Sequence, residues 1–490
     1  MEAEKKNIIL ISNGSGAMLD SIFSTDMYNI KLYVMPYKKD IEKLKNKYGN
    51  RIEAYYTYIK DTNSEFQNDL KCDYDLTYDE IEKYRTTQLK CYRYNCRFMN
   101  DDNTNNSIYY TTLKFFLNYF NENKIDCVIS YILEHGSVSD SLIFDIAKSK
   151  GIPVYIFSQN SGFGSINLLS LLYYNERTFI DISKINKQIV NINLLIDALY
   201  KNYSASKLTN LPFSKMIQKF VNKKNKTFIQ CIKWFFNYKI KFYVNNFKHS
   251  HLDDVYKICE NTSFFQIVKG HFYFSKIKRF YKRHSYNKIE GQNYIFYPLH
   301  LEPEAAIMAR LTMNCQLFII EQISQMLPDG WYLYVKEHPD QFNGVQFDKY
   351  MHKSIFNFRN IDFYKRLTKL KNVKLIKLNN SSSQLIDDAK ATLSISGSAL
   401  IEAVAKKKPV IIFGNDCSFI EKLKETFSIN EIQDISDAIN SIANGFKPNY
   451  SDLQDIANRF AFSFDMNNLY TVNDELVSIF SLIYNQLKNN

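Results

Sequence analysis

The chain has 490 residues, which exceeds the size of one compact core and favours two domains. Apolar residues make up 45% of it and charged residues 23%, as in an ordinary soluble globular protein, and the formal net charge is +11. No apolar stretch approaches the ~18 residues of a membrane span, and the eight cysteines lack the C-x-x-C spacing that would indicate a zinc site or a disulfide framework.

The N-terminal part predicts a buried strand followed by a helix. A five-residue run over 8–12, apolar up to Ile11, is too short for the core of a signal peptide and indicates a first strand of a sheet over 7–11. A glycine turn at 12–16 and an amphipathic helix from Ala17 follow it. The polar, tyrosine-rich stretch 61–106 is expected to be a helical insertion or an irregular excursion.

A second α/β unit follows this stretch. The pattern predicts a strand over 126–130, a helix over 139–148 and a strand over 151–157. Alternation of this kind is typical of a parallel, Rossmann-like sheet.

Two carboxylates, Glu134 and Asp140, follow the strand that ends at Ser130. Ligands gather at the carboxyl ends of parallel strands, and a carboxylate there can remove the proton from an acceptor hydroxyl. A helix cap by Ser137 or Ser139, with both carboxylates favoured by the helix dipole, explains the same residues structurally. As a general base, Glu134 is favoured over Asp140.

The stretch from about 175 to 288 is nearly free of glycine and alternates lysine with aromatic residues in helix-compatible runs. It predicts a helical connector. Basic amphipathic helices lie on anionic membrane surfaces, but a solvated lysine face gives the same pattern. The net positive charge is equally compatible with anionic substrates, nucleic acid or solubility alone, although no nucleic-acid-binding signature is present.

Three apolar strands in the C-terminal half end in polar residues that suit an anion. The strand ends are Tyr-Pro-Leu-His-Leu-Glu-Pro-Glu over 297–304, Val-Lys-Glu-His-Pro over 335–339 and Ser-Ile-Ser-Gly-Ser over 394–398. With helical patterns between them, they describe the ligand edge of an open parallel sheet. A ligand that carries a phosphate is therefore expected there.

The second strand end presents His338. Pro339 ends the strand and fixes the turn, and Lys336 adds a positive charge beside it. The imidazole can then donate to a phosphate oxygen, although a lone histidine is more often structural. At the first strand end, His300 and Glu304 flank Pro303 and are expected to be held rigidly at the same edge.

The third strand end contains Gly397, which lets the backbone approach a ligand closely, and the start of a helix whose free N–H groups attract an anion. Ser398 is expected to be the helix N-cap, and Glu402, one turn later, to accept from ribose hydroxyls. Capping alone also predicts serine there. Nearby, Ser382 and Ser383 begin another helix and are expected to contact a base or a phosphate.

At these residues the sequence resembles the bacterial capsule polysaccharide biosynthesis family, which includes Kdo transferases of capsule and lipopolysaccharide assembly. The resemblance covers about 293–420 and rests on Tyr-Pro-Leu-His-x-x-Pro-Glu, on Leu-Pro-x-Gly-Trp-x-Leu-Tyr-Val-Lys-Glu-His-Pro, on Ser-x-Ser-Gly-Ser with Glu402, and on Lys-Pro-Val-Ile-Ile-Phe-Gly. The His338-Pro339 pair and the nearby serines also look like the nucleotide-binding motifs of bacterial sialyltransferases.

The resemblance implies an α/β GT-B fold, with two Rossmann-like domains, a deep inter-domain cleft and a helical connector. It implies a metal-independent glycosyltransferase with no cofactor, in which His338 and Ser396 to Ser398 hold the phosphate of CMP and Glu402 holds the ribose. The domains expected are an acceptor domain over 1–180, the connector over 181–290, a donor domain over 291–450 and C-terminal helices over 451–490.

The predicted function is transfer of a sugar from a nucleotide-activated donor, with CMP-linked Kdo, sialic acid or a related nonulosonic acid favoured, to a bacterial surface polysaccharide or lipid-linked acceptor. A UDP- or GDP-sugar donor, and a non-catalytic glycan-binding role in capsule assembly or export, stay open as alternatives. A cytoplasmic location with peripheral contact to the anionic inner membrane is expected.

The predicted catalytic residues are Glu134, Asp140 and His338, with no metal. The residues predicted to bind the nucleotide-sugar donor are His300, Glu304, Lys336, Glu337, His338, Pro339, Ser382, Ser383, Ser396, Gly397, Ser398 and Glu402.

Overall fold

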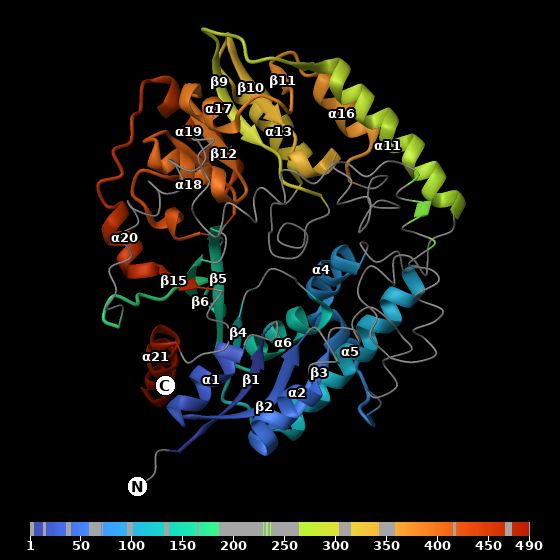
Figure 1. The fold of residues 1–490 in the computed structure, drawn as a ribbon, viewed down its shortest axis with the longest axis vertical. Coiled ribbons are helices and arrows are strands. Elements are labelled where there is room, and N and C mark those ends of the chain that lie inside the picture. Colours follow the sequence, from blue (N-terminus) through green and yellow to red (C-terminus); the bar gives the residue numbers. More distant parts are fainter. Residues whose placement is uncertain are drawn as a thin grey trace.

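The structure is a computed structural model and contains two α/β domains, each built around its own sheet (Figure 1). It describes residues 4–12, 16–35, 41–57, 70, 72–95, 101–131, 137–163, 166–185, 229, 232–233, 236, 264–302, 315–342, 358–414, 418–465 and 473–489.

The first sheet has the order β15-β6-β5-β4-β1-β2-β3, and β7 pairs with β6 outside this path. Its five strands from β3 to β5 are parallel, and β6 and β15 continue it in antiparallel pairing. The strands are β1 (Lys6–Ile11), β2 (Tyr28–Met35), β3 (Ile52–Thr57), β4 (Cys127–Tyr131), β5 (Val154–Phe163), β6 (Ile166–Tyr173), β7 (Thr178–Phe179) and β15 (Phe462–Asp465).

The helices of this domain follow the strands in sequence. They are α1 (Gly16–Thr25), α2 (Ile41–Tyr48), α3 (Tyr78–Lys83), α4 (Arg85–Asn95), α5 (Asp102–Glu122) and α6 (Val138–Ser149), with a short 3-10 helix η2 (Gly49–Arg51) after α2. Side-chain caps fix several starts: the Ser137 hydroxyl accepts the N–H of Asp140 at 3.2 Å to begin α6. The expected excursion over 61–106 thus contains helices in its described part.

The second sheet is parallel throughout, in the order β14-β13-β12-β9-β10-β11-β8. Its inner strands are buried on both faces, which explains their nearly continuous apolar sequences. The strands are β8 (Ser285–Tyr286), β9 (Asn293–Pro298), β10 (Trp331–Lys336), β11 (Val373–Ile376), β12 (Ala391–Ser394), β13 (Val410–Ile412) and β14 (Phe427–Ser428).

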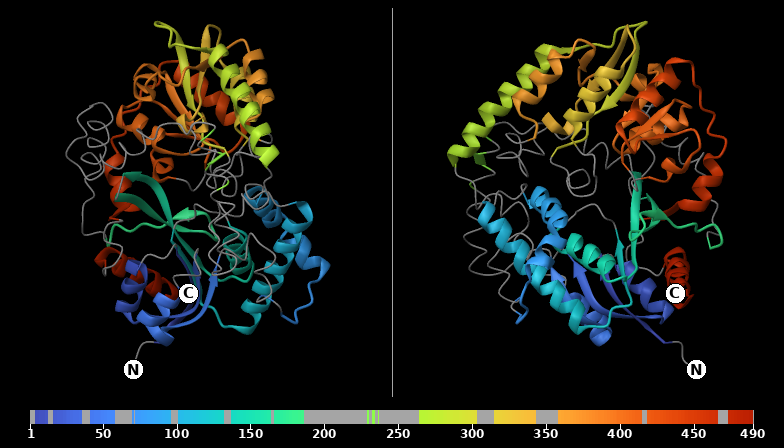
Figure 2. Two further views of the ribbon diagram at one scale, coloured as in Figure 1. Left: turned by 45° about the vertical axis from the view of Figure 1, so that its right-hand side comes forward. Right: turned by 180° about the vertical axis from the view of Figure 1, so that it is seen from behind.

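Helices pack on both faces of this sheet (Figures 1 and 2). Because each parallel strand must return to the same end of the sheet, a helix or loop crosses over between successive strands. The elements are α11 (Phe264–His284), α13 (Gln316–Met326), η6 (Pro339–Phe342), α16 (Ile361–Lys369), α17 (Ser382–Asp388), α18 (Ser398–Ala405), η7 (Phe419–Lys422) and α19 (Ile432–Ala443).

The C-terminal segment returns to the first domain. After α20 (Leu453–Phe460), strand β15 pairs with β6, and α21 (Asp474–Asn489) lies beside α1 (Figure 1). The hydroxyl of Tyr28 donates to the carbonyl of Phe480, and that of Tyr484 donates to the carbonyl of Glu4 at 3.0 Å. The sequence analysis predicted helices over 451–490. The described part of this segment contains the helices α20 and α21 and also the strand β15, which was not predicted.

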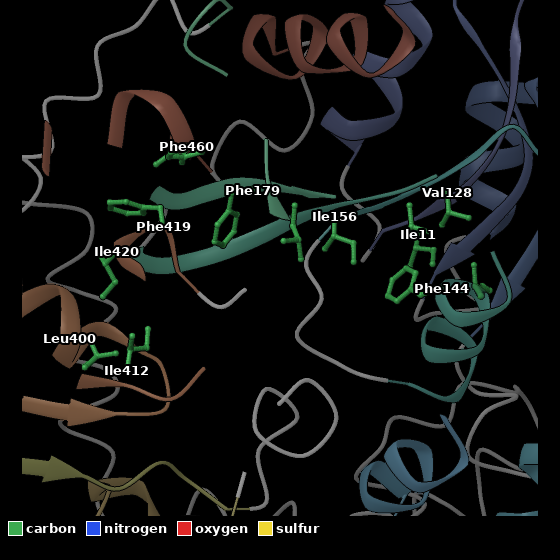
Figure 3. Packing of buried hydrophobic residues seen from close by; sticks show 14 of the residues in the cluster. Ile11, Val128, Phe144, Ile156, Phe179, Leu400, Ile412, Phe419, Ile420 and Phe460 are labelled. Atoms are coloured by element: carbon green, nitrogen blue, oxygen red, sulfur yellow. The ribbon is translucent and has the colours of Figure 1, made fainter. Parts of the chain in front are cut away.

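The two domains share one buried apolar cluster, part of which is drawn in Figure 3. It runs from Ile11 and Val128 of the first sheet through Phe179 to Phe419 and Leu400 of the second domain. A buried polar contact crosses the same boundary, since the amide oxygen of Asn160 accepts the N–H of Phe419 at 2.9 Å. The two sheets are therefore joined by packing as well as by the chain.

The predicted fold class of two parallel-sheet α/β domains is confirmed. The expected strand over 7–11 and helix over 139–148 appear as β1 and α6. The connector falls mostly outside the described residues, apart from α11, and the domain boundaries and the inter-domain cleft stay predictions. Within the described residues, no helix is long and apolar enough to cross a membrane.

Candidate functional site

The order of strands in the second sheet defines where a ligand is expected. From β9 the chain proceeds through β10 to β11 on one side, whereas β12, on the other side of β9, is followed by β13 and β14. Strand order therefore reverses between β9 and β12. In open α/β sheets, ligands bind outside the carboxyl ends of the strands at such a switch point. The residues that leave β9 and β12 are His300 and the turn Ser396–Gly397.

These residues contact each other directly. The Nε2 atom of His300 lies 3.0 Å from the hydroxyl of Ser394 and accepts the backbone N–H of Ser396 at 3.3 Å. The Ser394 hydroxyl lies 2.9 Å from the carbonyl oxygen of Ser396. A Cβ atom added to Gly397 would lie 3.5 Å from His300 Cε1, so the imidazole is seated against the glycine turn.

The imidazole of His300 is neutral. Burial, with the positive charges of His338 and Arg359 adding to it, lowers the pKa of His300 to about 4. In the tautomer in which Nε2 accepts the backbone N–H of Ser396, the ring proton sits on Nδ1. His300 therefore orders the turn after β12 and does not bring a charge to it.

The backbone of His300 is fixed as well. Its N–H donates to the side-chain oxygen of Gln316 at 2.8 Å, and its carbonyl accepts from Arg359 Nη2 at 2.9 Å. Gln316 is the first residue of α13 and is buried. The loop after β9 is thus held by side chains from two other elements, which suits a preorganised site.

Lys336 ends β10 at the same edge and is 5% exposed. Its Nζ donates to the hydroxyl of Ser382, at the start of α17, over 2.7 Å. Burial lowers the pKa of Lys336 to about 8, so the amine is still mostly protonated at neutral pH. Among the described residues it forms no salt bridge. A buried cation with a neutral partner suits an anionic ligand.

Glu337 turns away from this edge into the protein. One of its carboxylate oxygens accepts from Arg359 at 3.2 Å and from the hydroxyl of Tyr364, and the other accepts the N–H of His338 at 2.8 Å. Arg359 also pairs with Glu302, two residues after His300. Glu337 was predicted to bind the nucleotide-sugar donor. Its carboxylate instead accepts hydrogen bonds from Arg359, Tyr364 and the N–H of His338.

His338 is half-buried and follows the end of β10, where Lys336 pairs in register with Pro298 of β9, two residues before His300. Its carbonyl accepts the N–H of Gln341 at 2.9 Å, within the turn that Pro339 starts as the first residue of η6. The three strand ends that carry His300, His338 and Gly397 thus meet at one edge, as the sequence analysis expected.

The helix after β12 begins differently from the prediction. Ser398 is the first residue of α18, and the N-cap is Gly397, with φ +106° and ψ 174°. The prediction that Ser398 caps the helix is therefore wrong, because the chain enters the helix through a backbone conformation that only glycine adopts readily. The Ser398 side chain is exposed instead.

Glu402 and two residues of α17, Ser383 and Asp387, meet at Lys406. This lysine contacts Glu402 at 3.2 Å, Asp387 at 2.8 Å and the hydroxyl of Ser383 at 2.6 Å. The ribose contact predicted for Glu402 stays a prediction, and its carboxylate is engaged with Lys406 in the ligand-free protein.

In the first domain, Asp140 lies buried in the first turn of α6, behind the Ser137 cap. The helix-cap explanation thus holds for Ser137. Glu134 and Glu304 lie outside the described residues, and so do the loops that follow β1 and β4 at the switch point of the first sheet. The assignment of the general base stays a prediction.

Four polar residues at this site were not predicted as functional: Gln316, Arg359, Ser394 and Lys406. Ser394 lies inside the recognised motif, as the last residue of β12. Arg359 had no such signal, because it lies in a segment without strand or helix periodicity and reaches the site from a distance in sequence.

No group of three or more possible metal ligands is found in the part of the chain that the structure describes, and metal independence stays a prediction.

No family model and no curated protein matches the sequence. A similar solved structure is UDP-GlcNAc 2-epimerase of Methanocaldococcus jannaschii in complex with UDP-GlcNAc and UDP, with 11% identity over 99% of this chain and 100% of that one, at a TM-score of 0.27. Another is KpsC of Thermosulfurimonas dismutans, a β-Kdo 2,7-transferase, with 9% identity over 87% of this chain and 98% of that one, at 0.28. At these identities and TM-scores the likeness carries no argument about this chain.

Proposed function

We propose that the protein is a glycosyltransferase that moves a sugar from a nucleotide-activated donor to a glycan or lipid-linked acceptor of the bacterial surface. The donor proposed is a CMP-linked acidic sugar of the Kdo or nonulosonic type, bound by the second domain. The reaction takes place in the cytoplasm, without a metal ion or cofactor, and peripheral contact with the inner membrane accompanies it.

The observation that carries the proposal is that the neighbouring strands β12, β9 and β10 end at one edge of the second sheet, beside its switch point, and lead to Gly397, His300 and His338. Parallel sheets bind nucleotides at this place, because loops from neighbouring strands diverge there and leave room for a ligand. The backbone N–H groups at the start of α18 and the positive end of that helix favour a phosphate.

In the proposed reaction, negative charge builds up on the phosphate as the bond to the sugar breaks. Lys336, the N–H groups beyond Gly397 and the ring N–H of His338 stabilise that charge, which is the function of a preorganised electrostatic site. Neutral His300 keeps the glycine turn in place. A carboxylate of the first domain, for which Glu134 is proposed, removes the proton from the acceptor hydroxyl.

A thermal-shift titration of the purified chain with CMP, CTP, UDP and GDP, with and without EDTA, tests the proposal. A ligand that binds only the folded state raises the melting temperature, by an amount that grows with the logarithm of its concentration above Kd. A shift with CMP that EDTA leaves unchanged supports the proposed donor. A shift only with UDP or GDP overturns the donor and keeps the reaction class, and no shift with any nucleotide favours the non-catalytic glycan-binding alternative.

The His338→Ala variant extends the test from binding to turnover. We expect a loss of donor affinity and of transfer, with the melting temperature of the ligand-free protein little changed, because His338 is half-buried at the edge of the sheet. Normal turnover by this variant would remove His338 from the donor site.

A further inference from the structure

Helix α11 lies at the periphery of the second domain (Figures 1 and 2). Its outer side carries a basic and aromatic stripe. Its 21 residues contain no aspartate or glutamate. Six exposed residues recur at spacings of three and four, which places them on one side of an α-helix. We call them the outer stripe of α11: Phe265, Lys269, Phe272, Lys276, Arg279 and Arg283.

The opposite side of α11 belongs to the core of the second domain. Ile277 and Tyr281 are both 1% exposed, and Phe274 packs its ring against Phe342. The hydroxyl of Tyr281 donates to the carbonyl of Ile376 at the end of β11. Because these contacts fix how the helix is rotated, the outer stripe faces away from the sheet.

The stripe exposes two large aromatic side chains that a globular core does not require. Phe265 is 81% exposed and Phe272 is 63% exposed, seven residues or two helical turns apart. The other four residues of the stripe are cations: Lys269, Lys276, Arg279 and Arg283. No salt bridge found among the described residues involves any of these four. Their charge is thus available to an anionic partner.

We propose that the outer stripe of α11 docks the protein on an anionic lipid bilayer, with the phenylalanine rings at the level of the headgroups. Cationic side chains of an amphipathic helix are attracted by anionic lipids, and exposed aromatic rings enter the boundary between headgroups and acyl chains. The absence of any carboxylate in the helix matches a surface that carries negative charge throughout. This inference rests on the membrane contact in the proposed function and assigns a surface to it, and it requires no part of the donor site.

The full-length protein can be tested by co-sedimentation with vesicles of phosphatidylcholine alone and of phosphatidylcholine mixed with phosphatidylglycerol. We expect binding only to the mixed vesicles, and weakening at high salt, because the screening length falls from about 8 Å at physiological ionic strength to about 3 Å at 1 M. The Lys276→Glu/Arg279→Glu variant should bind at least about tenfold more weakly. The matched control, Lys43→Glu/Lys45→Glu on helix α2, changes the net charge equally on exposed positions of the other domain and should bind like the wild type.

The Phe265→Ser/Phe272→Ser variant separates the aromatic contribution from that of charge. Because salt hardly screens the burial of apolar surface, this variant should lose the part of the binding that persists at high salt.

Absence of wild-type binding to mixed vesicles at low salt overturns the proposal, as does an equal loss of binding in the α2 control. Binding of a fluorescent single-stranded oligonucleotide, without vesicle binding, assigns the stripe to nucleic acid and also overturns it. None of these outcomes depends on a nucleotide sugar, so they stand apart from the test of the proposed function.

Discussion

Arg359 and Glu337 form a buried ion pair, with Nε and Oε2 3.2 Å apart, between the two loops that carry the histidines of the candidate site. The arginine is 1% exposed. On one side it holds the carbonyl of His300 and the carboxylate of Glu302, and on the other side Glu337 holds the N–H of His338. One guanidinium group thus couples the ends of β9 and β10, so we assign it to positioning.

The Arg359→Gln variant should lose nucleotide affinity at least about tenfold and unfold more easily by about 3–5 kcal/mol, because removal of one partner leaves a buried carboxylate without compensation. Hydrogen exchange should speed up at both 299–302 and 337–341. The matched control is Arg366→Gln. Arg366 lies on α16 and forms a more exposed ion pair with Glu321 of α13 at 2.6 Å, away from both loops. Unchanged exchange in either loop would contradict the coupling, whether or not a nucleotide binds.

The turn at Gly397 gives a second prediction, because its backbone combines φ +106° with ψ 174°. A side chain there is strained by about 1–3 kcal/mol, and its Cβ would be in van der Waals contact with the ring of His300, 3.5 Å from Cε1. Gly397→Ala should therefore lower both stability and nucleotide affinity, as measured by urea unfolding and calorimetric titration. Gly330→Ala is the control: it also has positive φ, but its Cβ would meet open space, so stability should fall with affinity unchanged.

The sequence predicted correctly that the ends of β9, β10 and β12 lie at one edge of a parallel sheet, because strand ends have local signals. An apolar run followed by His338-Pro339, or by Ser396-Gly397, marks the point where a parallel strand stops, and the alternation of strands and helices makes such ends meet. The close approach of a ligand to Gly397 stays a prediction, and the positive φ of this residue was not predicted. The mistaken cap at Ser398 came from composition, since serine is common both at the N-cap and just after it.

Contacts between distant segments were not predictable in the same way. Arg359 follows no recognisable pattern, and its partners Glu302 and Glu337 lie 57 and 22 residues away. The return of β15 to the first sheet likewise depends on pairing with β6, which is far away in sequence. Such contacts are decided by which buried charges and strand edges must be satisfied in the folded protein, and single-segment periodicity contains no information about them.

The junction between the domains gives a third prediction, at Asn160. Its amide accepts the N–H of Phe419 and donates to the hydroxyl of Ser170 at 2.8 Å, in a buried position. Asn160→Ala leaves the Phe419 N–H without this acceptor and should cost about 1–3 kcal/mol in the free energy of unfolding. Asn458→Ala in α20 serves as control, because its side-chain oxygen accepts only from Gln454 on the same helix among the bonds found. An equal effect of the two substitutions would argue against a special role for the junction.

Lys336 gives a prediction in which stability and binding change in opposite directions. Its pKa falls from the ordinary 10.5 to about 8, so between these values the unfolded chain binds more protons than the folded one. The free energy of unfolding therefore rises with pH over this window, and the buried charge opposes folding below it. Lys336→Met should stabilise the protein at pH 7 by up to about 3 kcal/mol, from a shift of about 1.36 kcal/mol per pH unit.

Binding of an anionic nucleotide requires the charged amine of Lys336. Wild-type affinity should thus be constant below pH 8 and weaken above it, approaching about tenfold per pH unit, as deprotonation removes the charge. Lys336→Met should bind more weakly at pH 7 and lose this dependence, while Lys374→Met on the neighbouring strand β11, whose amine lies over the ring of Tyr332 instead, should keep it. Calorimetric titrations from pH 7 to pH 10 measure both. If Lys336→Met retains the pH profile of the wild type, another group carries the charge that the nucleotide meets, and Lys336 has no part in the donor site.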